Sequence, residues 1–160
     1  MIQQLPFEYE ILTSSELLSS EDALLLQQAR NSTQQSYAPY SLFHVGAAAR
    51  LTNGESIIGT NQENASYPVA ICAERVLLSA LSSRYPGAAV TTMAISFHNH
   101  KGVSKHPITP CGMCRQALVE HSFHFGQVIR LILAGQVGEV YIINDASSLL
   151  PLGFTANDMR

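Results

Sequence analysis

Three cysteines and one glutamate are the residues of this 160-residue chain whose types and spacing could do chemistry together. Cys111 and Cys114 are separated by two residues in the stretch PCGMCR, and Cys72 precedes Glu74 by two positions in CAER. A Cys-x-x-Cys pair alone is compatible with a redox dithiol, half of a zinc site or a coincidence. A redox pair would leave Cys72 without a role, so the grouping of the cysteines favours a shared metal ion.

The cysteines stand where two apolar helical patterns begin. The N-terminus of a helix lowers the pKa of a thiol there and prepares the thiolate to bind a cation. Three protein ligands without a fourth are typical of a catalytic zinc, which keeps one position for water, whereas a structural zinc takes a fourth Cys or His. The chain has six histidines, of which His106 is nearest in sequence to Cys111, so a fourth protein ligand stays open.

Glu74 is the residue that decides between these kinds of site. A carboxylate two positions after a ligand, at the start of a helix, can lie beside the metal without ligating it and can move protons for a reacting water. The plainer alternative is an ordinary acidic residue in a first helical turn. The sequence therefore predicts Cys72, Cys111 and Cys114 as ligands of one Zn²⁺ and Glu74 as the catalytic residue.

Helices and strands that alternate along the chain must position these residues. Apolar patterns predict helices over 20–35, 71–87 and 111–122, and strands over 42–51, 57–61, 90–98, 128–135 and 139–144. Asn53-Gly54 predicts a hairpin between the first two strands. FEYEIL, residues 7–12, alternates weakly and is compatible with a short edge strand. We predict an α/β fold in which a mixed five-stranded sheet lies between helical layers, α/β/α.

Composition limits the classes of protein to consider. Hydrophobic residues make up 46% of the chain, enough for one domain over 1–160, with a core over 20–154 and an N-terminal extension over 1–19. Lys and Arg number nine and the formal net charge is −3, a poor footprint for nucleic-acid binding. We expect no membrane partner, because no long apolar run is present, and MIQQLPFEYEIL does not resemble a secretory signal. The odd number of cysteines favours a reducing, cytoplasmic location.

The metal motifs resemble those of the zinc-dependent cytidine deaminases, whose pattern is H-x-E…P-C-x-x-C, with a three-cysteine variant. Three further segments are similar to segments of that family, in the same order. They are YAPYSLFHVGAA (37–48), which looks like its first strand, NQENASY (61–67), which looks like its nucleoside-binding segment, and LLPLGF (149–154), which looks like its C-terminal tail.

The resemblance implies a cytidine deaminase-like fold and zinc-dependent hydrolytic deamination of cytidine and deoxycytidine, a reaction of pyrimidine salvage. It also implies one Zn²⁺ per subunit, a nucleoside as the small-molecule partner, and a homotetramer. It assigns roles to seven further residues. Phe43 would pack on the pyrimidine, Asn61 and Glu63 would bind the ribose hydroxyls, the backbone of Ala73 would hold the base, Tyr67 and Phe154 would complete a neighbouring subunit's pocket, and Arg75 would hydrogen-bond a zinc thiolate.

Other readings stay open at this point. A related deaminase could act on another cytosine-containing molecule, such as blasticidin S, a free base or a nucleotide, although Glu63 would repel a phosphate. A non-catalytic, zinc-stabilised binding module would need a fourth ligand, and a dithiol redox protein would form a Cys111–Cys114 disulfide. Residues 1–19 have no assigned role. The His- and Lys-rich stretch over 98–107 is either a loop at the mouth of the site or a solvated excursion.

Overall fold

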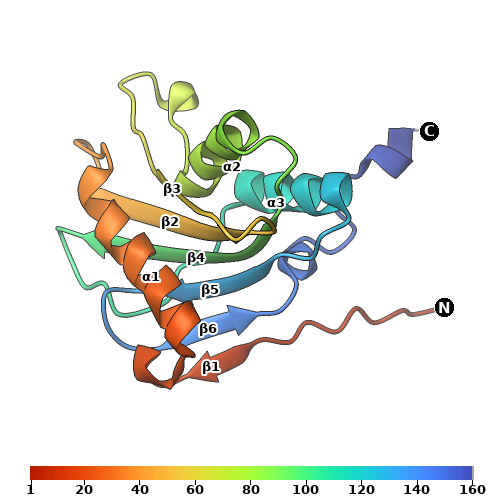
Figure 1. Ribbon diagram of the computed structural model, residues 1–160, viewed down its shortest axis with the longest axis horizontal. Helices are drawn as coiled ribbons and strands as arrows, with labels where there is room; N and C mark the ends of the chain where they lie inside the picture. The colour runs from red at the N-terminus through yellow and green to blue at the C-terminus, as the bar shows by residue number, and fades with distance from the viewer. Residues whose placement is uncertain (160) are drawn as a thin grey trace.

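The computed structural model describes residues 1–159 and contains one mixed six-stranded sheet (Figure 1). The strand order is β1-β6-β5-β4-β2-β3, in which β4 and β5 pair in parallel and all other neighbours are antiparallel. The strands are β1 (Glu10–Leu12), β2 (Phe43–Leu51), β3 (Ser56–Thr60), β4 (Val90–Asn99), β5 (Arg130–Ala134) and β6 (Val140–Ile143).

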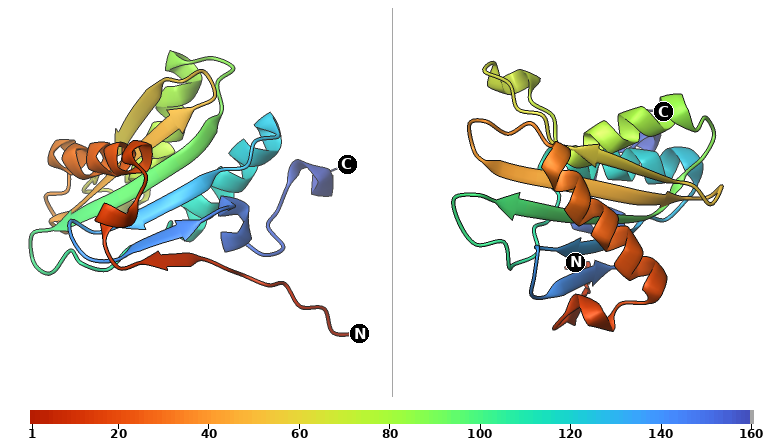
Figure 2. Two further views of the ribbon diagram at one scale, coloured as in Figure 1. Left: turned by 60° about the horizontal axis from the view of Figure 1, so that its bottom comes forward. Right: turned by 60° about the vertical axis from the view of Figure 1, so that its left-hand side comes forward.

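Three helices cover the two faces of this sheet. Helix α1 (Ser20–Ser32) lies on one face, and α2 (Ala73–Arg84) and α3 (Gly112–Phe125) lie on the other, as Figure 2 shows from two sides. Side chains alternate between the faces, so that Ala48 of β2 packs in a core with α1, whereas Ala47 and Ala49 pack in a larger core with α2 and α3. The predicted three-layer α/β/α arrangement is confirmed.

The direction of two strands brings the starts of α2 and α3 to the same edge of the sheet. Both β3 and β4 are antiparallel to β2, so they run parallel to each other. Helix α2 follows β3 and helix α3 follows β4, and both helices pack on the same face. Their N-termini therefore meet beyond the carboxyl ends of β3 and β4, which is where the cysteines lie.

Gly59 of β3 allows α2 to approach the sheet closely. A Cβ built on Gly59 would lie 2.5 Å from the carbonyl oxygen of Ala73 and 2.6 Å from the backbone nitrogen of Leu77. Any larger residue would push the first turn of α2 outward, because both contacts are to backbone atoms. Gly59 therefore sets how deeply Ala73 and the residues beside it sit against the sheet.

The structure corrects the strand count and the ends of all three helices, since α2 ends at Arg84 and not at residue 87, and α3 continues beyond residue 122 to Phe125. The sheet has six strands and not five, because β1 pairs antiparallel with β6 through Glu10↔Ile142. A strand of three residues carries too little alternation to be counted from sequence, yet it satisfies backbone groups along the edge of β6. The helix predicted over 20–35 is α-helical to Ser32 and continues as a 3₁₀ turn over Thr33–Gln35.

The chain before β1 runs away from the body of the molecule (Figures 1 and 2). Met1 and Ile2 are almost fully exposed. Residues 10–12 lie within the predicted extension but belong to the sheet, and the division at residue 20 stays a prediction. None of the helices within residues 1–159 is long and apolar enough to cross a bilayer.

Candidate metal centre and its cleft

The starts of α2 and α3 bring the three cysteine sulfurs together. Cys72 is the N-cap residue of α2, Cys111 is the N-cap residue of α3, and Cys114 lies in the first turn of α3. The Sγ atom of Cys111 lies 3.7 Å from that of Cys72 and 3.5 Å from that of Cys114, and all three atoms lie within 4.8 Å of one another. No cysteine is engaged in a disulfide.

This sulfur spacing fits zinc. Four ligands at a Zn–S distance of about 2.3 Å in a tetrahedron are about 3.8 Å apart, close to the separations observed here. Within the described part of the chain, the gathered ligand atoms are these three sulfurs and include no histidine nitrogen or carboxylate oxygen. The donor set therefore provides three protein ligands, as in catalytic zinc sites.

The three thiols influence one another's protonation. A hydrogen bond with Cys114 lowers the pKa of Cys72 to about 6, and the same contact, together with burial, raises the pKa of Cys114. Cys72 therefore ionises before Cys114, which retains its proton. A metal must displace such protons, so zinc affinity is expected to fall as pH falls.

Glu74 is buried beside the sulfurs without a cationic partner in contact. It occupies the first turn of α2 and is 5% exposed. The ion pairs among residues 1–159 join Arg50 or Arg130 to acidic residues of α1, and none includes Glu74. Burial raises the pKa of Glu74. A buried carboxyl group whose pKa is raised is suited to taking up and releasing protons.

A cleft of about 530 Å³ opens onto the sulfurs and Glu74. The sequence-predicted residues that line it are Phe43, Asn61, Glu63, Tyr67, Cys72, Ala73, Glu74 and Cys111. The ring of Phe43 is held against Phe97 of β4, with ring centroids 4.9 Å apart and planes 17° apart. Cys114 is fully buried behind this wall. The cleft thus combines an apolar wall, two polar side chains and the metal centre in a volume typical of small-molecule sites.

Asn61 and Glu63 are positioned by hydrogen bonds with the β2 end of the cleft. Asn61 Oδ1 accepts from the backbone N–H of Val45, and its Nδ2 donates to the carbonyl of Phe43. Glu63 Oε2 accepts from the backbone N–H groups of Tyr40 and Ser41. These bonds use one oxygen of Glu63 and one site on each polar atom of Asn61, so both side chains retain capacity for a ligand.

Besides Cys114, the sequence-predicted residues Arg75 and Phe154 lie outside the set that lines the cleft, and Tyr67 reaches the cleft only at its margin. Arg75 Nη1 donates to the sulfur of Met113 at 3.7 Å, and its predicted bond to a thiolate stays a prediction. Tyr67 is 75% exposed at the mouth. Phe154 is 58% exposed, and its carbonyl accepts from Gln116. Tyr67 and Phe154 are thus accessible to a second subunit, as a shared pocket would require.

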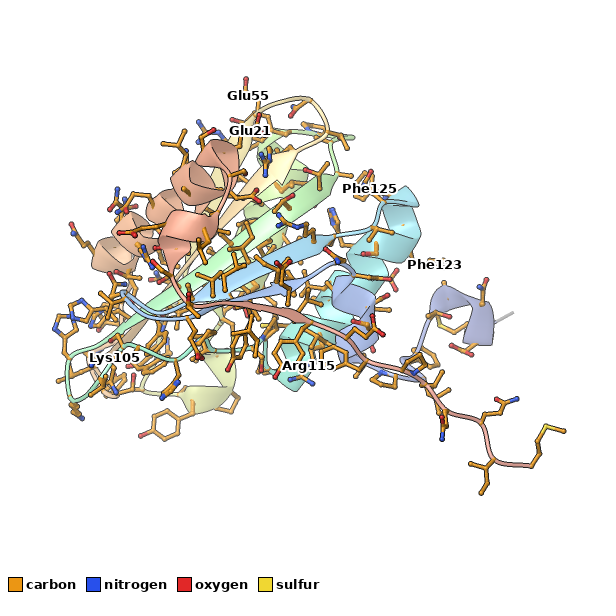
Figure 3. The ribbon with its side chains drawn as sticks, turned by 90° about the horizontal axis from the view of Figure 1, so that it is seen from below. Glu21, Glu55, Lys105, Arg115, Phe123 and Phe125 are labelled. Carbon is orange, nitrogen blue, oxygen red and sulfur yellow. The ribbon has the colours of Figure 1, made fainter. Side chains whose placement is uncertain are left out.

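Arg115 has a positional role that its sequence context did not reveal. Its guanidinium donates to the carbonyls of Pro110 and Leu149 and to Oγ1 of Thr109. These bonds tie the residues before Cys111 to the C-terminal LLPLGF segment, beside which Arg115 is labelled in Figure 3. A motif search identifies neither this clamp nor the lining residues Val45, Ile108 and Met113, which enter the cleft through tertiary packing.

Fold and cleft together define an α/β protein with a three-cysteine zinc centre and a buried carboxylate beside it. Residues 19–129 match the family model of the cytidine and deoxycytidylate deaminase zinc-binding region. A cytidine deaminase of Halalkalibacterium halodurans is 38% identical over 137 residues, which cover 86% of this chain and 96% of that protein. The crystal structure of cytidine deaminase from Burkholderia pseudomallei superposes with a TM-score of 0.70 at 35% identity and covers 86% of this chain and 100% of its own.

The chain therefore belongs to the cytidine and deoxycytidylate deaminase family, and it carries the family's zinc-binding region. A blasticidin-S deaminase of Bacillus cereus is more distant, at 26% identity over 142 residues. The match to the Burkholderia structure leaves 14% of this chain uncovered.

Proposed function

We propose that this protein catalyses the hydrolysis of cytidine and deoxycytidine to uridine and deoxyuridine, with release of ammonia. The observation that carries the proposal is the cleft in which Glu74, Cys72 and Cys111 lie together with Phe43, Asn61 and Glu63, while the sulfur of Cys114 completes the metal centre behind it. The similarity to cytidine deaminases over most of both chains supports the same substrate class.

In this proposal the protein moves protons through Glu74. Cys72, Cys111 and Cys114 would hold the Zn²⁺, which would supply Lewis-acid chemistry that makes water more acidic. Glu74 accepts one proton from the water that attacks C4 of the pyrimidine and delivers it to N3. It then accepts the proton of the resulting C4 hydroxyl and delivers it to the amine, which leaves as ammonia. Because Glu74 is buried and its pKa is raised, it can hold a proton between each uptake and the delivery that follows.

The walls of the cleft would bind the two halves of the nucleoside separately. Phe43 offers its ring to the pyrimidine, and the backbone of Ala73 at the start of α2 offers polar groups to the base edge. Asn61 and the free oxygen of Glu63 would bind the ribose hydroxyls. Hydrogen bonds from Tyr40 and Ser41 outweigh desolvation and lower the pKa of Glu63, so it carries a negative charge that disfavours a phosphorylated substrate.

We also propose a homotetramer in the cytoplasm that serves pyrimidine salvage. Exposed Tyr67 and Phe154 are the residues that would enter a neighbouring subunit's pocket. Three free cysteines fit a reducing compartment. Sedimentation of the zinc-loaded protein tests the oligomer. Phe154→Ala should then raise KM more than it lowers kcat, and a fully active monomer would contradict this part.

The activity is tested by ammonia release from zinc-loaded protein. Parallel assays use cytidine, deoxycytidine, cytosine, dCMP and blasticidin S at equal concentration. We expect turnover of the two nucleosides and little of dCMP, because Glu63 repels its phosphate. Turnover of blasticidin S alone would favour the antibiotic reading, and zinc-loaded protein that releases ammonia from none of them would overturn the proposal.

A further inference from the structure

Three of the six histidines gather at the carboxyl end of β4 and on the strand beside it, β2. The rings of His98 and His100 are stacked with centroids 4.2 Å apart, and the ring of His44 meets His100 edge to face at 4.7 Å. His98 and His100 are exposed and His44 is half-buried. The cluster comes from β2 and from the start of the His- and Lys-rich stretch, which the proposed reaction does not use.

Strand register places the three side chains on one face. His44 of β2 is directly opposite His98 of β4, and the backbone N–H of His100 donates to the carbonyl of Leu42, so the pairing extends to His100. Residues two apart on a strand point to the same face. Ala48 of β2 and Ala94 of β4 pack with α1. His44 is four positions from Ala48 and His98 is four positions from Ala94, so both histidines point to the same face as these alanines. The cluster therefore lies on the α1 face, opposite the cleft.

Ser36 holds the ring of His44 in one orientation. Its Oγ lies 2.9 Å from Nδ1 of His44, which leaves Nε2 of the same ring directed elsewhere. A hydrogen bond to the far nitrogen is what metal-binding histidines commonly make, because it fixes the ring and the tautomer. His44 is thus oriented by a neighbour, while the exposed rings of His98 and His100 can rotate without disturbing the core.

We propose that His44, His98 and His100 form a second metal site, which takes a divalent ion of the Ni²⁺, Cu²⁺ or Zn²⁺ kind through imidazole nitrogens. Imidazole suits these ions. His98 near the end of β4, His100 in the turn that follows it and His44 opposite them on β2 can converge on one ion. Among residues 1–159 the tightly gathered ligand group is the cysteine one, so the exposed rings of His98 and His100 must turn toward that of His44 on binding.

The position of the cluster connects it to the wall of the cleft. His44 adjoins Phe43 in β2, and His98 adjoins Phe97 in β4, and these two phenylalanines stack on the opposite face. An ion that cross-links His44 to His98 or His100 would therefore clamp the two strands that carry the aromatic wall. The test below does not use catalysis, so its outcome is independent of the proposed deaminase activity.

Nickel titration of zinc-loaded, tag-free protein tests this site. Isothermal titration calorimetry with Ni²⁺ is expected to show one additional ion per chain, with the zinc content of the cysteine centre unchanged by elemental analysis. His98→Gln and His100→Gln should each weaken Ni²⁺ binding at least tenfold, because each removes one of three ligands. Ser36→Ala should weaken it by a smaller factor, because it frees the ring of His44.

His124→Gln is the matched control, because His124 is an exposed histidine on α3, far from this cluster in sequence and in fold. It should bind Ni²⁺ as the wild type does. His98, His100 and His124 are exposed, so we expect these variants to fold as the wild type does. Circular dichroism checks that a change in Ni²⁺ affinity is not caused by misfolding. Absence of a Ni²⁺ site, or a Ni²⁺ affinity of His98→Gln and His100→Gln equal to that of the wild type, would overturn the proposal.

Discussion

Two carboxyl groups, Asp22 and Glu74, are buried to nearly the same degree in first helical turns on opposite faces of the sheet. Asp22 is 8% exposed and Glu74 is 5% exposed. Asp22 accepts from Arg50 Nη2 at 2.8 Å and from Arg130 Nη1 at 2.8 Å. Glu74 faces a cleft and three sulfurs and has no ion-pair partner in the described residues. The same burial thus surrounds one paired and one unpaired carboxyl.

The difference in partners reverses the effect of burial on the pKa. Burial disfavours ionisation of Asp22, but the hydrogen bonds and charges of Arg50 and Arg130 outweigh it and lower the pKa. At Glu74 burial dominates and the pKa is raised. A paired carboxyl stays ionised and cross-links α1 to β2 and β5, whereas an unpaired one remains able to gain and lose protons. We infer that Asp22 serves stability and Glu74 serves chemistry.

Exchanging the carboxylate of Glu74 for an amide should produce the largest effect. Glu74→Gln keeps the size of the side chain but cannot transfer protons, so kcat should fall by at least about 10³-fold. Ammonia release measures kcat, and elemental analysis should show that zinc is retained, because Glu74 is not in the ligand group. An active Glu74→Gln enzyme would contradict the assigned role.

Removing the paired carboxylate should instead lower stability. Asp22→Ala leaves two arginines without their shared partner, and because both are about one-third exposed we expect a loss of about 2–3 kcal/mol in the free energy of unfolding. Urea unfolding of the metal-loaded protein measures it. The matched control is Glu21→Ala, whose side chain is 79% exposed and pairs with the same Arg50, and which should cost less than about 1 kcal/mol. Equal losses in both variants would contradict the distinction.

Local signals were sufficient to predict most elements and the zinc-binding region. Asn53-Gly54 predicted the hairpin, which Gly54 completes with a φ of 87°. The apolar patterns that begin at Cys72 and Cys111 predicted both helix starts. Each of these signals lies within a few residues of the feature that it specifies, which is why one sequence suffices to find it.

Features that depend on pairing between distant segments were not predictable in this way. The sixth strand, β1, lies within FEYEIL, whose weak alternation is compatible with a short edge strand but does not identify its partner β6, which is 132 positions later for Glu10 and Ile142. The contact of Arg115 with Leu149 and the meeting of His44 with His100 likewise depend on topology. The convergence of the two helix starts also depends on topology, because it follows from the common direction of β3 and β4. The spacing of the two motifs carries no information about that direction.

The clamp made by Arg115 should matter less than Glu74 but should affect the metal. Arg115→Met removes the bonds that hold Thr109 and Pro110 in front of Cys111. We expect zinc affinity to fall about tenfold, since partners that orient ligands contribute on this scale. Competition with a chromophoric chelator measures it. Gln116→Met, on the next residue of the same helix, removes a bond to the Phe154 carbonyl and should leave zinc affinity unchanged.

The smallest expected effect is on how the difference in unfolding free energy between wild type and Asp22→Ala depends on pH. The sign of this effect follows from the lowered pKa of Asp22. A carboxyl whose pKa is lower in the folded state stabilises fully above its unfolded-state pKa, near 3.8, and loses this contribution as pH falls through the folded-state value. The gap in unfolding free energy between wild type and Asp22→Ala should therefore be constant from pH 7 to about pH 5 and narrow in acid below about pH 4. Urea unfolding of both proteins across this range measures the gap. A gap that instead widens in acid would mean that Asp22 is protonated in the folded state, and the contrast with Glu74 would disappear.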